Sequence, residues 1–447
     1  MKNICSCLLL SWLLITSSES ALRAQSLQQL AAAYTAGCQQ LHLPEPDFDF
    51  RRSLQPRPNE ANWAQQQTFF GDFRRRLRRV VRRRLPLTDR VLYEQLAYET
   101  HQHLQRLRLL RSLPAAALGP PASAGLTALP HAHAWYAFYA QRATNMPLTA
   151  KQLLVFGQQQ VRRAQREIRR LRVQLGYGAD SVGFYRWLAG PQFVLTDTAT
   201  ILRQYQLLDR RVRARLPALF ADTLVPGLPI RTWPGATAPM PPAIYQAEQV
   251  PPVFAFNFAT GRLNRRVLDW SFLHEAIPGH HYQLTRPLLG GTSPLAPLAL
   301  YYPATVEGWG CYAEYLGQEL GLYQTPEAEL GHWEWDLVRS ARVVLDVGIH
   351  DQGWSYAQAL AYWRATIPGQ DDIAEREIRR VTLWPGQCLS YKVGAEHIAR
   401  LCAQLARRPG FTIRRFHQAY LLLSGLPLAL VEKNLAALYT QLGGRQG

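Results

Sequence analysis

The stretch SFLHEAIPGHHYQL, residues 271–284, is the most informative segment of this sequence. It begins like the zinc-protease motif H-E-x-x-H, with His274 and Glu275 in place, but Pro278 stands where the second histidine belongs. In that motif, two histidines four residues apart reach one ion from one face of a helix, and the glutamate serves as general base. The segment therefore raises the question of whether a metal site is built here with a different spacing.

Two later histidines, His280 and His281, are candidates for the second ligand. On a straight helix, the sixth position after His274 lies about 120° around the axis, and the seventh lies roughly 10.5 Å further along it. Neither can share an ion with His274 unless the helix opens. Pro278 removes a backbone donor and Gly279 accepts unusual dihedral angles, so the two predict a bulge. His280 becomes the ligand if two residues are looped out, and His281 if three are; we favour His280 because it needs the smaller bulge.

A third ligand is expected from the segment YYPATVEGWGCYAEYLGQEL, residues 301–320. The segment is typical of a helix that begins near Pro303, and it carries Glu307 and Glu314. Glu307 follows His280 by 27 residues, a distance that suits the glutamate of a two-histidine, one-glutamate zinc site. The sequence therefore predicts Zn²⁺ as cofactor, with helix capping by Glu307 as the alternative.

Composition and periodicity predict a mainly α-helical globular protein. The 447 residues are 47% hydrophobic, enough for a large core. Apolar residues recur at helical spacing along most of the chain, and VFAFNF, residues 253–258, is the clearest of a few short strands. We expect a signal peptide over 1–24, a helical scaffold over 25–225 and a catalytic zinc-binding region over 226–447, the last two forming one continuous fold.

The N-terminus predicts export. Lys2 precedes an apolar run over residues 4–15, and a cleavage site follows Ala24. The run is too short to span a membrane, and no later window reaches the roughly 20 apolar residues that a span needs. We therefore expect a periplasmic or extracellular protein without a transmembrane segment. The cysteines that remain, Cys38, Cys311, Cys388 and Cys402, are expected to be buried free thiols.

The formal charge of +18 is almost entirely due to arginine. The densest run, residues 74–84, holds eight arginines around a narrow apolar stripe, which is typical of a solvated helix face. No nucleic-acid recognition motif accompanies it, so we expect no specific nucleic-acid partner. The sequence carries no signal for an oligomeric state.

Four blocks of sequence together resemble a known family. They are HEAIPGHHYQ (274–283), TVEGWGCYAEYL (305–316), RVVLDVGIHDQGWS (342–355) and EIRRVTLWPGQCLSYKVG (377–394). They look like the signature blocks of the domain-of-unknown-function 885 family of bacterial zinc metallopeptidases. The upstream segment MPLTAKQLLVFGQQQV (146–161) is also similar, so the resemblance covers most of the chain.

The resemblance implies a large helical peptidase fold with a long active-site cleft. Such a fold is similar to the thimet-oligopeptidase, angiotensin-converting-enzyme and thermostable-carboxypeptidase groups. The implied metal residues are His274, Glu307 and either His280 or His281, with Glu275 as general base. Donors to the oxyanion would come from His350, Tyr391 and Lys392, with Asp346 and Gln387 as supporting residues. A structural role for Asp346, His350 and Tyr391 as buried, hydrogen-bonded residues is the alternative.

The sequence departs from the family pattern at two places. Val381 stands where the family usually has tyrosine, and Gly310-Cys311 replaces the usual alanine-leucine. We expect the first change to remove a hydroxyl from the cleft and the second to affect packing. Neither is expected to touch the metal ligands.

The expected function is an exported, zinc-dependent peptidase that acts on short peptides. Arg342 or Arg380 would hold a substrate carboxylate through bidentate contacts, with Lys392 nearby, which would make the enzyme a carboxypeptidase or dipeptidase. An oligopeptidase fits the sequence equally well. The rival hypotheses are another zinc-dependent amide or ester hydrolase, a non-catalytic binding protein on the same scaffold, and an arginine-mediated binder of nucleic acid or anionic surfaces.

Overall fold

The computed structural model of this protein describes residues 27–43, 60–113, 125–238, 240–290, 298 and 300–444. The protein is mainly helical, with 69% helix and 4% strand, which confirms the helical class predicted from the periodicity. Within the described ranges, no helix combines the length and the apolar character that crossing a bilayer requires. The expected signal peptide, 1–24, lies outside these ranges.

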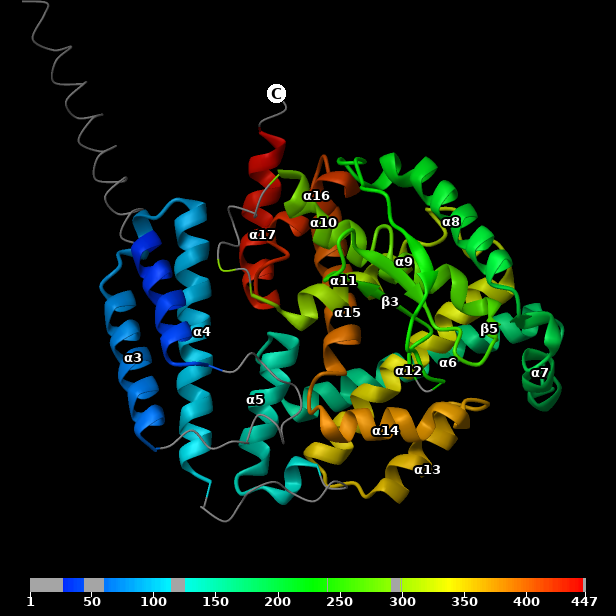
Figure 1. The fold of residues 1–447 in the computed structure, drawn as a ribbon, viewed down its shortest axis with the longest axis horizontal. Helices are drawn as coiled ribbons and strands as arrows, with labels where there is room; N and C mark the ends of the chain where they lie inside the picture. Colours follow the sequence, from blue (N-terminus) through cyan, green and yellow to red (C-terminus); the bar gives the residue numbers. More distant parts are fainter. Residues whose placement is uncertain are drawn as a thin grey trace, which may run out of the picture.

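Three helices form a separate layer at one end of the molecule (Figure 1). They are a helix over 27–40, α3 (Glu60–Arg78) and α4 (Leu87–Arg111). Tyr34, Phe70, Phe73 and Leu96 form the buried contact among them. The arginine-rich run breaks where α3 ends, and its eight arginines are exposed while Leu77 is buried, as expected for a solvated helix face.

The middle of the chain forms the long scaffold helices. These are α5 (Ala132–Thr144), α6 (Ala150–Gln174), α7 (Ser181–Leu188) and α8 (Thr198–Leu219). Thr149 caps α6 through a reciprocal hydrogen-bond pair with Gln152. Gly157 brings α6 against α12 (Pro326–His350), because a Cβ there would lie 2.9 Å from Val343.

The described part of the chain also forms two small sheets. β1 (Val194–Leu195) pairs antiparallel with β5 (Leu263–Asn264). In the second sheet, β4 (Val253–Phe256) lies between β2 (Ile230–Thr232), which is parallel to it, and β3 (Ala243–Gln246), which is antiparallel. All four β4 residues are buried, and β3 forms an edge of the sheet next to α9.

Nine further helices of the described residues follow the sheets along the chain. They are α9 (Leu268–Glu275), α10 (His280–Gly290), α11 (Pro303–Tyr315), α12, α13 (Tyr356–Thr366), α14 (Ala374–Leu383), α15 (Leu389–Ala406), α16 (Ile413–Leu423) and α17 (Leu428–Gly443). α11 and α15 approach until their backbones touch, since a Cβ on Gly308 would lie 2.5 Å from the Cα of Gly394. Glycine at both positions permits this distance.

The main core spans the boundary expected near residue 226. Tyr205 and Val212 of α8 belong to the same buried cluster as Phe254, Trp309 and Tyr420. The scaffold and the region that follows it therefore share one core. The four cysteines of the described residues are free thiols, although only Cys311 and Cys388 are fully buried.

Candidate metal site

The helix that starts the motif breaks between Glu275 and His280. α9 ends at the first of these residues and α10 begins at the second. Gly279 fills the tightest point, because a Cβ there would lie 1.9 Å from the carbonyl oxygen of His274. The indole nitrogen of Trp309 donates to the Pro278 carbonyl at 2.8 Å, which holds the break against α11. The predicted interruption is therefore present and packed in place.

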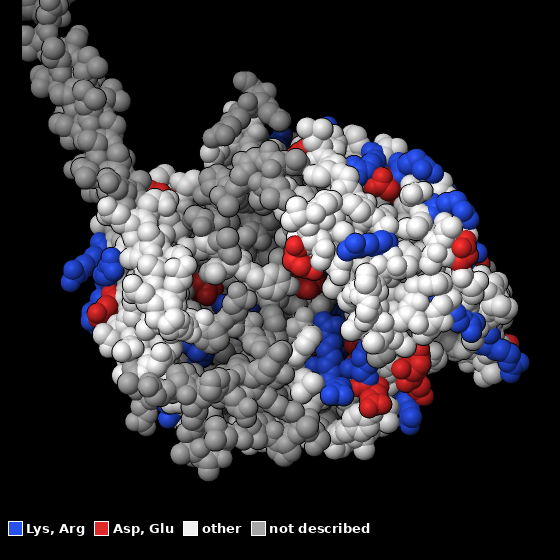
Figure 2. All heavy atoms as spheres, viewed as in Figure 1, with Lys and Arg blue, Asp and Glu red and all other residues white. Residues whose placement is uncertain are grey.

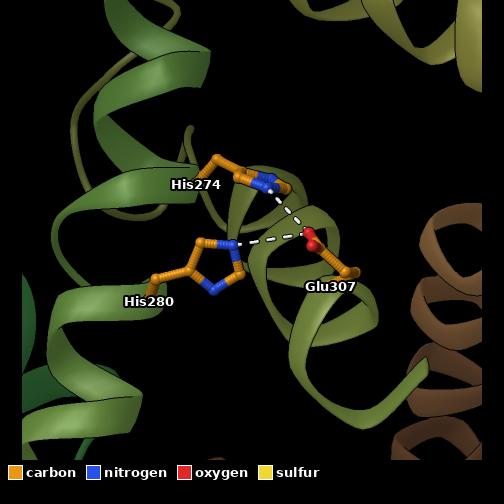
Figure 3. A group of neighbouring side chains, drawn as sticks. All are labelled: His274, His280 and Glu307. Atoms are coloured by element: carbon orange, nitrogen blue, oxygen red, sulfur yellow. Dashed lines mark ion pairs between the residues drawn. The ribbon is translucent and has the colours of Figure 1, made fainter. Parts of the chain in front are cut away.

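This break brings three potential ligands to one point (Figure 3). Oε2 of Glu307 lies 3.7 Å from Nε2 of His274 and 3.5 Å from Nε2 of His280. All three ligand atoms lie within 4.8 Å of one another. Ligands at about 2.0–2.2 Å from a tetrahedral zinc ion are spaced roughly 3.3–3.6 Å apart, so the group fits such an ion after small side-chain movements.

His281 points away from this group. Its Nε2 donates to the Pro226 carbonyl at 3.0 Å, because a carbonyl oxygen can only accept. Its Nδ1 lies 3.3 Å from the Tyr245 hydroxyl, which leaves both ring nitrogens occupied. Of the two alternatives left by the sequence, the structure brings His280, and not His281, to His274 and Glu307.

The charges of the three residues are strongly coupled. Burial alone would raise the pKa of Glu307, but its contacts with His274 and His280 hold it well below the usual value. Burial likewise opposes protonation of His274, yet contacts with Cys311, Glu307 and Glu314 raise its pKa well above the usual value. The site therefore favours an ionised Glu307 beside a protonated His274. A bound cation would take over the positive charge that this proton supplies.

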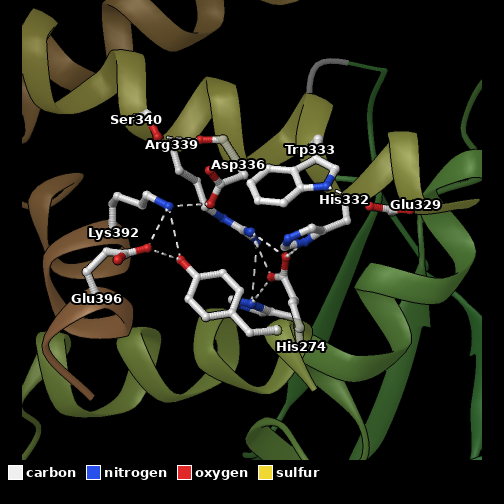
Figure 4. Close-up of polar contacts among 11 residues, drawn as sticks. His274, Glu329, His332, Trp333, Asp336, Arg339, Ser340, Lys392 and Glu396 are labelled. Atoms are coloured by element: carbon white, nitrogen blue, oxygen red, sulfur yellow. Dashed lines mark hydrogen bonds and ion pairs between the residues drawn. The ribbon is translucent and has the colours of Figure 1, made fainter. Parts of the chain in front are cut away.

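A second layer of polar residues supports His274 from behind (Figure 4). Its Nδ1 donates to Oε1 of Glu314 at 2.8 Å, so Nε2, which faces Glu307, is the nitrogen that would bind a metal. Glu314 is fully buried and also bonds Arg339 at 2.7 Å and His332 at 3.2 Å. Burial would raise the pKa of Glu314, but Arg339 and the two histidines hold it well below the usual value.

Gly310 and Cys311, which depart from the family pattern, lie next to the His274 ring. A Cβ on Gly310 would lie 2.8 Å from the imidazole of His274, and the Cys311 sulfur lies within 4.8 Å of a nitrogen of the same ring. The expectation that this pair leaves the metal ligands untouched is therefore wrong. Val381 is buried in the core of α12 and α14 and does not face the cleft, so the expected loss of a cleft hydroxyl is also wrong.

The three ligand candidates open onto a cleft of about 930 Å³. β3, α9, α10, α11, α12, α14 and α15 contribute to its lining, and its volume is in the range of small-molecule sites. Glu275 lies in the cleft, where its Oε2 accepts from the backbone nitrogen of Tyr245 at 2.9 Å. Burial raises the pKa of Glu275, although the neighbouring histidines oppose this shift.

Two tyrosines face the same cleft. The ring of Tyr391 stacks beside His274 with 6.4 Å between centroids, and its hydroxyl accepts from Arg380 at 2.9 Å. Tyr301 donates its hydroxyl to Oε1 of Glu307 at 3.2 Å. The sequence analysis singled out Tyr391 but missed Tyr301; its position six residues before Glu307, at the start of the same segment, was the available signal.

His350 and Lys392 lie outside the cleft lining, contrary to the oxyanion roles expected for them. Nδ1 of His350 accepts from the Leu126 backbone at 3.1 Å and Nε2 donates to the Val381 carbonyl at 2.8 Å. Burial lowers the pKa of His350 to about 4. Lys392 is buried and bonds Asp336 at 2.6 Å. Their contacts are those of structural residues in the protein interior.

Asp346 and Gln387 were expected as supporting residues, and among the described residues no hydrogen bond joins either of them to His274, His280 or Glu307, although Gln387 bonds Tyr391. Asp346 accepts from the Gly386 backbone nitrogen at 2.9 Å, and burial raises its pKa to about 7. Gln387 accepts from Arg380 at 3.0 Å and donates to the Tyr391 hydroxyl at 3.3 Å. Arg342 and Arg380, the expected substrate-binding arginines, both line the cleft.

The comparisons with known proteins agree with the block resemblance. Residues 113–435 match the model of a family described as bacterial protein of unknown function, DUF885. The chain belongs to the DUF885 family. Among solved structures, a “putative lipoprotein” from Colwellia psychrerythraea is similar with a TM-score of 0.63 and 24% identity, over 91% of this chain and 72% of that one.

A second similar structure is a “putative lipoprotein of unknown function” from Shewanella oneidensis. Its TM-score is 0.56 at 21% identity, and the match covers 84% of this chain and 72% of that one. At these identities the likeness to both structures concerns the fold. No curated protein matches the chain.

Proposed function

We propose that this DUF885 protein is an exported, zinc-dependent peptidase of helical metallopeptidase fold that hydrolyses short peptides. The observation that carries the proposal is the convergence of His274, His280 and Glu307 beside Glu275 in the cleft. Two histidines and one glutamate are a ligand set found in catalytic zinc sites of peptidases. The buried cluster behind His274 supports the same assignment, because metal-binding histidines usually donate their second nitrogen to a carboxylate.

The ligand geometry defines what the metal would contribute. Zinc held by these three residues would lower the pKa of a bound water and would polarise the carbonyl of a substrate. Glu275 is placed beside that position by the backbone nitrogen of Tyr245, which bonds Oε2 and leaves Oε1 available. Its raised pKa brings it closer to the operating pH of a general base.

The chain's own residues account for the proton movements of peptide hydrolysis. Glu275 takes a proton from water as the water oxygen bonds to the carbonyl carbon. The same carboxyl then gives the proton to the nitrogen of the leaving amine as the carbon–nitrogen bond breaks. The Tyr391 hydroxyl accepts from Arg380 and Gln387, so its own proton would be free to donate to the developing oxyanion in the cleft.

The cleft also suits an extended peptide backbone. β3 is an edge strand of its sheet, and Ala243, Ile244 and Tyr245 line the cleft. An edge strand beside a binding site is the arrangement by which a peptide adds to a sheet. Export is part of the proposal: it rests on the N-terminal sequence and on the description of two similar structures as lipoproteins.

The proposal is tested by zinc content and peptide turnover in the same preparations. We expect about one zinc per chain in the wild type and in Glu275→Gln, and little in His274→Ala, which loses a ligand. Glu275→Gln should lower turnover of a mixed peptide pool by about 10²–10⁴-fold, the usual contribution of a general base.

His281→Gln is the matched control, because it alters the neighbouring histidine that faces away from the site. It should retain zinc. Absence of bound zinc from the wild type after loading would refute the metal site. Zinc binding with turnover of esters and of no peptide would refute peptidase activity and favour a different zinc hydrolase.

A further inference from the structure

One wall of the cleft is basic. α12 contributes Arg342, and α14 contributes Arg376, Arg379 and Arg380 to the lining. Figure 2 shows basic side chains gathered beside a hollow near the middle of the face in view. A group of fixed positive charges in a cleft attracts anionic ligands. The hydrolytic mechanism above uses none of these arginines.

Two of the arginines share one carboxylate. Arg342 donates to Oε2 of Glu377 at 2.5 Å, and Nε of Arg376 donates to Oε1 at 2.8 Å. Burial would raise the pKa of Glu377, but Arg342, Arg376 and Arg380 lower it to about 2. Glu377 is therefore ionised and compensates much of the charge of its two partners.

Arg380 differs in having only neutral partners. Its Nη2 donates to Oε1 of Gln387 at 3.0 Å and to the Tyr391 hydroxyl at 2.9 Å. Among the described residues, no carboxylate lies within ion-pair distance of it, and its buried Nε has no hydrogen-bond partner. A guanidinium is always charged, and Arg380 has no direct ionic partner, because the nearby Glu377 carboxylate bonds Arg342 and Arg376 instead. An anionic ligand would supply the missing carboxylate.

Arg380 also lies close to the candidate metal site. Arg380 bonds the hydroxyl of Tyr391. The ring of Tyr391 in turn stacks beside the ring of His274, with 6.4 Å between the two centroids. A residue of extended peptide spans about 3.3–3.6 Å, so a carboxylate bound by Arg380 would lie only a few residues from a peptide bond at the candidate metal site. The C-terminus of a peptide is a carboxylate. Holding this carboxylate at one point therefore decides which peptide bond lies at the candidate metal site.

We propose that Arg380, oriented by Gln387 and Tyr391, binds the free C-terminal carboxylate of the substrate. The enzyme would then release one or two residues from the C-terminus and would not cut long chains internally. This inference rests on the proposed peptidase function and adds the class of substrate. Arginine suits the task because its planar fork can bond both oxygens of a carboxylate.

Binding provides the first test, in a form that needs no turnover. An N-acetylated hexapeptide is prepared with a free C-terminal acid and with a C-terminal amide, and each is titrated calorimetrically into zinc-loaded Glu275→Gln protein. We expect the acid to bind about 10–100-fold more tightly than the amide, the usual range for a charge-assisted hydrogen bond. Adding Arg380→Gln should abolish this preference by weakening only the binding of the acid.

Arg379→Gln is the matched comparison. It removes the same charge from the neighbouring position of α14, where the side chain is exposed. The preference for the acid should persist in this variant. Equal loss of preference in both variants would show that diffuse charge attracts the peptide, and would overturn the assignment to Arg380.

Product analysis by mass spectrometry gives the second test, on the wild-type protein alone. Removal of one or two C-terminal residues from the acid, and much slower cleavage of the amide, are expected. Internal cleavage of both peptides at equal rates would overturn the carboxylate anchor and leave the peptidase function intact. Zinc-loaded protein that neither binds nor cleaves either peptide would overturn both proposals.

Discussion

The two sides of the His274 ring carry two clusters with almost the same ingredients. On the Nε2 side, His280 and Glu307 face the cleft; on the Nδ1 side, Cys311 and Glu314 are buried. In each cluster the possible ligand atoms lie within 4.8 Å of one another. Distance alone therefore does not distinguish them.

What distinguishes the clusters is the presence of a guanidinium. Arg339 lies 3.4 Å from Nδ1 of His274 and bonds Glu314, so that a positive charge already occupies the buried side. No arginine or lysine of the described residues forms an ion pair with Glu307. A group of donors becomes a good metal site when it lacks an internal cation, and only the cleft side of His274 meets this condition.

One helix supplies both carboxylates. Glu307 and Glu314 are seven residues apart on α11, and therefore lie on one face about two turns apart. The same ring is thus held between a proposed ligand and its support. Three predictions test this division, in order of decreasing effect.

The largest effect is expected from removing the two carboxylates separately. Glu307→Gln should reduce bound zinc from about one per chain to near zero, because it replaces a ligand. Glu314→Gln should lower zinc affinity only by about 10–100-fold, the usual effect of losing a supporting hydrogen bond. Competition with a chelator measures both. Equal losses in the two variants would break the distinction between ligand and support.

A smaller effect is expected from removing the buried cation. Arg339→Met leaves the ionised Glu314 without its main partner, which should lower the free energy of unfolding by about 3–5 kcal/mol. The control is Arg364→Met, since Arg364 pairs with Asp371 at 3.4 Å on the surface, where a pair contributes about 0–1 kcal/mol. Urea unfolding measures both. Similar losses in the two variants would contradict a special role for Arg339.

The smallest effect concerns histidines in the core, which contrast with those at the cleft. Burial lowers the pKa of His350 and of His417 to about 4. Each is neutral in the folded protein, while the unfolded chain binds a proton below its ordinary pKa. Their contribution to stability is therefore complete above about pH 6.5 and falls between about pH 6.5 and pH 4.

The expected slope is about 1.4 kcal/mol per pH unit for each of these groups. Urea unfolding at several pH values measures it, and His350→Gln should remove the share of one group. An unchanged slope in this variant would show that His350 does not carry the predicted pH dependence.

The sequence was sufficient to predict the helical class and the centre of the site. Pro278 and Gly279 explain why His280 takes the position of the missing histidine, because both act on the backbone locally. Glu307 was predicted from its separation of 27 residues from His280 along the sequence. These features depend on neighbouring residues or on one further helix.

The sequence did not predict which side chains of a long helix point toward the cleft, because this depends on how that helix is rotated against its neighbours. Along α12, polar residues recur from Asp336 to His350, and the pattern does not say which of them reach the cleft. Arg339 and Arg342 line it, but His350 lies about 12 Å further along the axis than Arg342 and is enclosed in the core. Lys392 was misplaced for the same reason: its chemistry suits catalysis, but its helix turns it towards Asp336.

The contact between Gly308 and Gly394 has a mechanical consequence. Gly308 follows Glu307 on α11, and Gly394 lies three residues after Tyr391 on α15. Because the two backbones touch without an intervening side chain, these helices cannot slide past each other independently. The two helices therefore form one rigid unit that carries both Glu307, the proposed ligand, and Tyr391. If the cleft narrows around a bound molecule, the movement must then come from the other side of the cleft, which includes the short strand β3.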